Sequence, residues 1–363
     1  MSSEAGPAPA PAVSAARPPA AELIAAFASI YLVWGSTFLA IRYAVETIPP
    51  FAMMAGRCLV GGGILLALGL IRERDPEWPT RREWGGAVVI GTLLFVGCHG
   101  VLAYAEEKVP SGIAALCLAT IPLFVPLLVW ALPDGRPPSR RRVGAFVVGF
   151  AGVALLVVSQ GTSGGLHPAD AFLLVGSALS WAAGTVATRV VPVPRSPVVG
   201  AAMPLLAGGV ILTVIAAGSG ELSSLNLADV SGRSIGGLVY LVVFGTVLTF
   251  SAYVWLLRVV APARVATYAF VNPAVAVVLG WAVAGESLTA GAVVASAVIV
   301  AAVAVAVSEP LPPSRWRSPS ASALRPETLQ LGHPASANCR GDRWVVTLTA
   351  TQSRYIVMVR DSH

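Results

Sequence analysis

The chain has 363 residues, of which 56% are hydrophobic and 12% charged, and its formal net charge is +6 at pH 7. Its mean hydropathy is +0.76. A soluble domain carries about 25% charged residues, so this composition excludes a water-soluble globule and indicates an integral membrane protein in contact with the lipid bilayer.

The chain begins with residues 1–22, which are rich in Ala, Pro and Ser and predict a disordered tail. It is not a cleavable signal peptide, because the first apolar run begins only after it. Ten apolar segments follow, and each predicts a helix because a single segment in lipid must satisfy its own backbone. These segments cover residues 23–44, 51–71, 85–105, 112–132, 143–160, 170–190, 197–217, 235–257, 264–284 and 289–308. Residues 309–363 predict a second, largely disordered tail with short strands at 344–350 and 355–359.

Charge in the loops predicts the orientation of the segments. Arginines cluster after the even-numbered segments, at Arg72, Arg74, Arg81, Arg82, Arg136, Arg140, Arg141, Arg142, Arg189, Arg195, Arg258 and Arg264. The opposite loops carry acids, at Glu46, Glu106, Glu107, Asp170, Glu221 and Asp229. Because basic loops stay inside, both termini are predicted to be cytoplasmic. This arrangement of arginines is a topology signal, and we expect no nucleic-acid partner.

Two apolar stretches, 263–289 and 112–136, correspond to each other. When Pro273 is placed over Pro122, Trp281 falls on Trp130. An apolar helix that occurs twice in a membrane chain indicates an internal duplication.

A second pair of stretches extends the duplication. Residues 34–42 read WGSTFLAIR and residues 181–189 read WAAGTVATR, with Trp and Arg at the same spacing. Five segments per half is an odd number, so the two halves must cross the membrane in opposite directions. The predicted fold is an all-α membrane protein of ten transmembrane helices in two inverted five-helix repeats, at 23–160 and 170–308.

These features together resemble the EamA-like members of the drug/metabolite transporter superfamily, over about residues 24–308. The resemblance is carried by Trp34-Gly35, Gly56-Arg57, the Pro122 and Pro273 helices and Gly285-Glu286. It implies a carrier that moves small metabolites, often outward, by alternating access. The first half departs from the family pattern, because Asp134-Gly135 stands where Gly-Glu is expected.

A substrate pocket is predicted from polar and aromatic residues within the segments. Arg57 lies inside the second segment, where a charge either contacts an anionic substrate or pairs with a carboxylate or with helix-end carbonyls. Asn272 precedes a mid-segment proline, and carriers place substrate sites at such interruptions. Aromatic walls suit a small amphipathic molecule, although Trp and Tyr also populate membrane interfaces. The predicted substrate-binding residues are Trp34, Arg57, Tyr104, Trp181, Thr249, Tyr253, Tyr268 and Asn272.

Three titratable residues are candidates for proton coupling: His99, Glu106 and Glu286. His99 lies within a span and titrates near neutral pH, but a lone buried histidine is more often a packed residue. Glu106 is expected to be a solvated loop acid at the outer end of its segment, and Glu286 a turn or cap residue. Arg42 and Glu46 are four residues apart, which predicts a surface ion pair.

The chain contains no His-Glu-x-x-His or P-loop motif, and its four cysteines lack metal-ligand spacing. We therefore expect no enzyme activity, no metal and no cofactor, and transport driven by a gradient or by exchange. The leading hypothesis is a bacterial inner-membrane exporter of amino acids or toxic small molecules. The alternatives are a flippase of lipid-linked substrates with the same fold, a membrane enzyme acting on lipids, and a sensor or scaffold. Small residues in the fifth and tenth segments suggest a homodimer face.

Overall fold

The structure is a computed structural model that describes most of the apolar part of the chain. The described residues are 19–72, 78–133, 135, 137–161, 166–260, 262–265, 267–308, 338–339, 343–350 and 353–360. The chain divides into two compact units, Met1–Trp316 and Arg317–His363. Most of the two predicted disordered tails and Asp134 lie outside the described residues.

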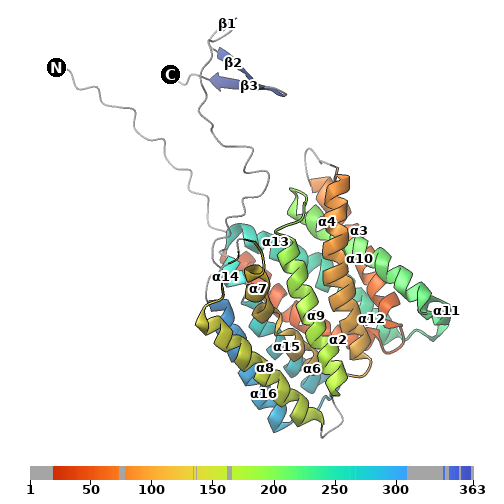
Figure 1. Ribbon diagram of the computed structural model, residues 1–363. Helices are drawn as coiled ribbons and strands as arrows, with labels where there is room; N and C mark the ends of the chain where they lie inside the picture. The colour runs from red at the N-terminus through yellow and green to blue at the C-terminus, as the bar shows by residue number, and fades with distance from the viewer. Residues whose placement is uncertain are drawn as a thin grey trace. The chain divides into compact units, whose positions relative to one another are not determined.

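The first unit is helical throughout its described residues (Figure 1). Its first half contains α1 Ala20–Ala28, η1 Ser29–Val33, α2 Trp34–Ala44, α3 Pro50–Arg72, α4 Arg81–Gly91, η2 Thr92–Gly100, α5 Val101–Glu106, α6 Ser111–Leu118, α7 Ile121–Trp130 and α8 Arg140–Gly161. Its second half contains α9 Pro168–Ala187, α10 Pro197–Gly218, α11 Glu221–Ser224, η3 Leu227–Asp229, α12 Gly232–Tyr240, η4 Leu241–Leu248, α13 Thr249–Val259, α14 Pro262–Val265, α15 Tyr268–Ala284 and α16 Ala290–Ser308.

Within the described ranges, nine continuous helical segments are long and apolar enough to cross a bilayer. The ninth predicted segment, 264–284, appears as α15, which is apolar but has only 17 residues. Where a span consists of consecutive helices, these are taken together. The observed ends then differ from the predicted ends by at most four residues; for example, the third span was predicted to begin at residue 85 and begins at Arg81. A multi-pass helical membrane protein is therefore shown, whereas ten spans in inverted repeats remain a prediction.

Several spans are not regular α-helices. π-Helical stretches occupy η1, η2 and η4, in the first, third and eighth predicted segments. Such stretches are rare and occur often at functional sites. The fourth segment is interrupted by a turn at residues 119–120, after which α7 begins with Pro122 in its first turn. A proline is tolerated there because a first-turn residue needs no backbone N–H donor.

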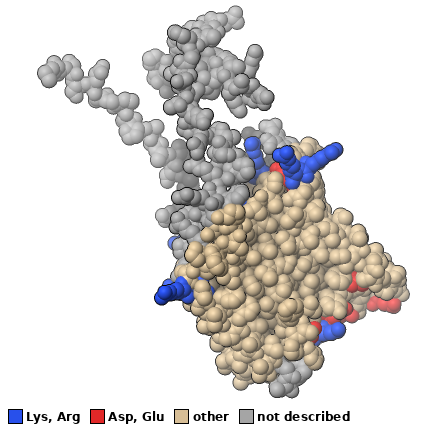
Figure 2. Space-filling view, viewed as in Figure 1, with Lys and Arg blue, Asp and Glu red and all other residues tan. Residues whose placement is uncertain are grey.

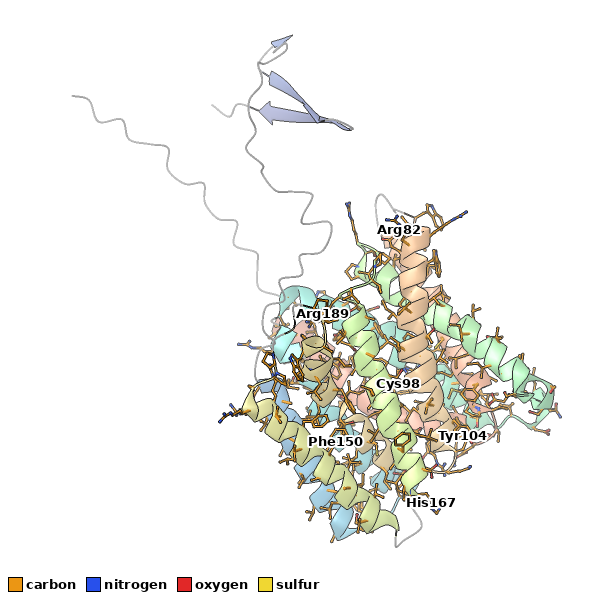
Figure 3. The ribbon with its side chains drawn as sticks, in the orientation of Figure 1. Arg82, Cys98, Tyr104, Phe150, His167 and Arg189 are labelled. Atoms are coloured by element: carbon orange, nitrogen blue, oxygen red, sulfur yellow. The ribbon has the colours of Figure 1, made fainter. Side chains whose placement is uncertain are left out.

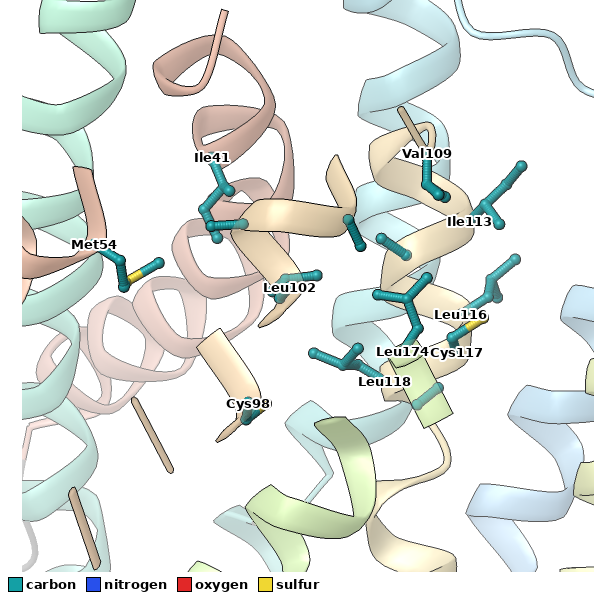
Figure 4. Packing of buried hydrophobic residues seen from close by; sticks show 14 of the residues in the cluster. Ile41, Met54, Cys98, Leu102, Val109, Ile113, Leu116, Cys117, Leu118 and Leu174 are labelled. Atoms are coloured by element: carbon teal, nitrogen blue, oxygen red, sulfur yellow. The ribbon is translucent and has the colours of Figure 1, made fainter. Parts of the chain in front are cut away.

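The buried core lies between the helices and consists mainly of aliphatic, Ala and Cys side chains (Figure 4). In Figure 1, α8 (olive) and α16 (blue) run side by side, in agreement with their contacts. A side chain at Gly152 would touch Ile299 of α16 at 2.8 Å, so small residues permit this close approach. The small residues predicted to form a homodimer face thus serve packing within one chain, and a homodimer stays a prediction.

Charged side chains separate towards two ends of the helical unit. Figure 2 shows Lys and Arg gathered at the end where α4 begins, and acidic residues near α11. In Figure 3, Arg82 and Arg189 lie at the first of these ends, and Tyr104 and His167 towards the other. We call them the basic end and the acidic end. The orientation in which the basic end faces the cytoplasm stays a prediction.

The second unit holds a small antiparallel sheet among its described residues. Its strands are β1 Asn338–Cys339, β2 Arg343–Ala350 and β3 Ser353–Arg360, in the order β1-β2-β3. In the β2–β3 register, Val346 lies opposite Val357. β2 and β3 lie where alternation of the sequence predicted two short strands.

Candidate functional site

A cavity of about 150 Å³ lies inside the helical unit. The first five predicted segments contribute Trp34, Thr37, Phe38, Arg57, Phe95, Cys98, His99, Ala115, Leu118, Ala119, Ile121 and Pro122. The last five contribute Trp181, Leu205, Thr246, Phe250, Tyr268, Ala269, Asn272 and Pro273. A cavity of this volume holds a molecule about the size of benzene. Both halves of the chain therefore contribute to one site that can hold a small molecule.

Arg57 is the charged side chain of this cavity. It projects from α3 and is only 6% exposed. Its Nε donates to Thr246 Oγ1 at 3.2 Å, and its terminal nitrogen Nη1 is buried with no hydrogen-bond partner among the described residues. The described ion pairs give Arg57 no carboxylate partner. Because a buried cation is costly unless it is paired, the guanidinium has unused capacity to bind an anion.

Two clusters of rings line the cavity, and each cluster contains side chains from both halves of the chain. Trp34 lies edge-on to Tyr268, with ring centroids 5.1 Å apart. His99 lies edge-on to Trp181 at 4.8 Å, and Phe95 contacts Trp181 at 6.3 Å. Edge-to-face packing of this kind fixes the orientation of each ring. The rings present an apolar surface to an occupant of the cavity.

Irregular helices hold these side chains in place. Trp34 Nε1 donates to the Gly245 carbonyl in η4 at 3.0 Å. With its amide oriented towards the neighbouring carbonyls, Asn272 Nδ2 donates to Ile30 and Tyr31 at 3.1 Å and to Tyr268 at 3.2 Å. Carbonyls of π-helical stretches thus accept from cavity side chains, which orients both the indole and the amide.

Three predicted pocket residues do not line this cavity. Tyr104 is 41% exposed and stacks on Phe51, with ring centroids 6.1 Å apart. It lies five residues after the cavity-lining His99, so its side chain points to a different face of the helix. Thr249 is fully buried and donates to the carbonyl five residues earlier at 2.7 Å, which stabilises the π-helical turn. Tyr253 packs behind Trp34, with centroids 5.3 Å apart. The other five, Trp34, Arg57, Trp181, Tyr268 and Asn272, line the cavity, as does His99.

Glu286 occupies the N-terminus of α6, which belongs to the other half of the chain. Its Oε1 accepts from Ser111 N and Ser111 Oγ, both at 2.7 Å, and its Oε2 accepts from Gly112 N at 3.0 Å. Gly285 ends α15 with φ +68°, and a side chain at Gly280 would collide with the Glu286 carboxylate. The carboxylate satisfies free N–H groups and interacts favourably with the helix dipole. Glu286 is therefore a cap, and its proton-coupling role stays a prediction.

Glu106 is not the solvated loop acid that the sequence indicated. Its side chain is 0% exposed, and neither carboxylate oxygen has a hydrogen-bond partner among the described residues. Arg42 donates instead to the Glu106 backbone carbonyl. The predicted Arg42–Glu46 surface pair is also replaced, because Glu46 lies 3.5 Å from Arg233 of α12. The helices close over Glu106 at the end of α5, which only their packing could reveal.

Two acidic residues outside the spans have raised pKa values. Burial raises the pKa of Glu107, the neighbouring Glu221 carboxylate adds to the effect, and Lys108 opposes it. Burial also raises the pKa of Glu221, while backbone N–H groups of Ala52 and Phe51 oppose the shift. Glu221 Oε2 accepts from Ala52 N at 2.9 Å, so a second carboxylate caps a helix at the acidic end.

Comparison with known proteins places this architecture in a family. The model of the EamA-like transporter family matches residues 21–158 and 169–308. The chain belongs to the EamA-like transporter family. It is 37% identical over 268 residues to the uncharacterized inner membrane transporter YedA of Escherichia coli (strain K12), covering 74% of this chain and 84% of YedA.

More distant relatives of this EamA-like chain include YvbV of Bacillus subtilis (strain 168), an uncharacterized transporter. The two are 24% identical over 262 residues, covering 72% of this chain and 84% of YvbV. A crystal structure of a protein with 21% identity superposes with a TM-score of 0.54 and covers 79% of this chain and 96% of that one. The latter likeness shows the fold alone, whereas the family and its relatives support a membrane transporter role.

Sequence reasoning missed several cavity residues of the EamA-like chain. Phe95, Cys98, Thr246 and Phe250 line the cavity, and three of them lie in the π-helical stretches η2 and η4. A π-helix has a wider turn than an α-helix, so the face predicted from α-helical spacing is wrong there. The Gly-rich run that ends η2, and the close spacing of Thr246 in η4 and Thr249 at the start of α13, were the available signals.

Proposed function

We propose that this chain is a secondary transporter that carries a small molecule through the central cavity by alternating access. The observation that carries the proposal is the cavity, whose walls come from both stretches matched by the family model. A site shared by two halves changes its exposure when one half rocks against the other. We further propose ten spans in two inverted repeats, with both termini in the cytoplasm.

Different contacts join the two halves at two places outside the cavity lining. At the acidic end, Glu286 caps α6 and Ser234 Oγ donates to the Tyr43 carbonyl at 2.8 Å, both across the two halves. One turn before Trp34, Tyr31 Oη and Thr267 Oγ1 lie 2.5 Å apart, beside an apolar cluster that includes Ile30 and Leu256. Opening to one side requires one set of contacts to break while the other is kept, which is the behaviour that alternating access needs.

Family resemblance favours export, with amino acids or toxic small molecules as cargo. Of these, the cavity lining suits a small organic acid better than a zwitterionic amino acid, because it offers Arg57 and no carboxylate among the described residues. We propose that transport is driven by an ion gradient or by exchange. The sequence has no P-loop motif that would bind a nucleotide and couple its hydrolysis to transport.

Flux through liposomes tests the proposal. The purified chain would be reconstituted and assayed with a panel of amino acids, organic anions, nucleosides and cationic drugs, with and without a pH gradient. Trp34→Leu should abolish saturable flux, because it removes an oriented cavity wall. Trp130→Leu is the matched control, since Trp130 is 52% exposed and away from the cavity. Equal flux in the two variants would contradict transport through this cavity. Movement of a lipid-linked precursor alone would support a flippase instead.

A further inference from the structure

The charges lining the cavity are unbalanced. Arg57 is the charged residue among the described lining residues, and none of those lining residues is Asp or Glu. Most of the remaining wall is aliphatic or aromatic. Charge complementarity in a low-dielectric site favours an occupant with the opposite sign, because the ion pair offsets the desolvation of both charges.

The guanidinium is held in place for such an occupant. Its Nε is anchored to Thr246 Oγ1, which itself donates to the Leu241 carbonyl at 2.9 Å in η4. Its Nη1 has no partner among the residues the structure describes and is buried. A donor that is fixed, buried and unpaired is unusual in a folded protein and indicates a missing acceptor. A carboxylate supplies that acceptor with the charge and planarity that guanidinium recognises.

We propose that this cavity binds a small organic monoanion: one carboxylate on Arg57, and an apolar body no larger than a ring. The inference rests on the proposed use of the cavity as the substrate site, and it adds the chemical class of the substrate. The volume of about 150 Å³ matches a molecule of this size. The Trp34–Tyr268 ring pair and the Trp181 indole, which His99 meets edge-on, supply the apolar walls.

The same features disfavour two other classes of ligand. A dianion brings one negative charge more than Arg57 neutralises, and burying the excess is costly. A zwitterionic amino acid brings an ammonium group, for which the described lining residues offer no carboxylate. An ammonium would find only neutral acceptors among the described lining residues, such as the hydroxyls of Thr37 and Thr246, near a guanidinium that repels it. A simple monocarboxylate carries neither cost.

Equilibrium binding to the purified chain in detergent tests the inference without requiring transport. The probes are radiolabelled benzoate and 4-methylpentanoate, with benzamide, benzylamine and phenylalanine as competitors that replace or add charge. Benzoate should bind at least about tenfold tighter than benzamide, since a charge-assisted hydrogen bond is worth that factor or more. Benzylamine should compete more weakly than benzamide.

Variants at Arg57 identify the side chain responsible. Arg57→Gln should remove the preference for benzoate over benzamide, and Arg57→Lys should keep part of it because the charge remains. Arg82→Gln is the matched control, since this exposed arginine at the start of α4 is outside the cavity and should leave affinity unchanged. Size-exclusion profiles establish that each variant is folded. If Arg57→Gln does not fold, the ligand series on the unmodified chain and on Arg57→Lys still decides the question.

The outcomes separate the inference from the proposed function. Benzoate binding without flux in liposomes would support the ligand class and contradict transport. Flux of other solutes that depends on Trp34, with no binding of either carboxylate at millimolar concentration, would overturn the ligand class and leave transport standing. Equal affinity for benzoate and benzamide, or tighter binding of benzylamine or phenylalanine, would also overturn it.

Discussion

Replacing Glu286 by Gln should destabilise the chain, because this carboxylate joins the two halves at the N-terminus of α6. The carboxylate accepts three hydrogen bonds, from Ser111 N, Ser111 Oγ and Gly112 N. An amide keeps one oxygen, which can still accept the two bonds from Ser111. Its NH₂ group then faces the Gly112 N–H, so one acceptor and the negative charge are lost.

The expected cost follows from these contacts. Losing one charge-assisted hydrogen bond costs about 1.5 kcal/mol. Losing the charge at the helix N-terminus costs about 0.5 kcal/mol more for a partly exposed group. The total is ~2 kcal/mol, which for a helical unit of this size lowers the melting temperature by about 4 °C.

A thiol-reactive dye can report this change. Cys58, Cys98 and Cys117 are free and buried, so they become reactive only when the helices separate. Cys339 would be replaced by Ser in every variant so that these buried thiols alone report unfolding. Glu46→Gln is the matched control, because its ion pair with Arg233 at 3.5 Å is exposed and contributes less than about 1 kcal/mol.

The result that refutes this reasoning is equally specific. A Glu286→Gln melting temperature within about 1 °C of the unmodified chain, or no lower than that of Glu46→Gln, would show that the cap contributes little. If destabilisation is observed, flux measurements on the same variant would establish whether weakening this contact also eases opening at the acidic end.

Two further predictions concern titratable groups at the acidic end. Glu106→Gln should abolish the response of flux to an imposed pH gradient while exchange continues. The reason is that this buried carboxyl, which has no hydrogen-bond partner among the described residues and is faced by Arg42 and by the Glu286 cap, can bind and release a proton. An unchanged pH response would leave His99 and Glu286 as the coupling candidates. Burial raises the pKa of Glu221, so the folded state binds its proton more tightly than the unfolded state does, and stability should be lost as pH rises from the unfolded pKa through the folded one. Glu221→Gln should therefore flatten the fall in melting temperature across this acidic range, and an identical pH profile for both proteins would contradict the assignment.

The resemblance to the family and the helical segments could be predicted from the sequence, because both depend on local properties. The length of an apolar run is set by the thickness of the bilayer. The ends of each run were predicted to within four residues; the third was predicted to begin at residue 85 and begins at Arg81. Arg57 was identifiable for the same reason, since a charge inside an apolar run is conspicuous without any neighbour. Ten spans and their inversion were also inferred in this way and remain predictions.

The tertiary structure decided which side chains meet. Tyr104 and Thr249 looked like pocket residues, but the helical twist directs one to the surface and the other into the wall of η4. Glu106 looked solvated until packing of the neighbouring helices buried it. Glu286 proved to cap a helix 175 residues earlier in the chain. Hydropathy describes how each segment meets the bilayer, whereas the direction of a side chain depends on local helix geometry and on neighbours distant in sequence, which no local pattern encodes.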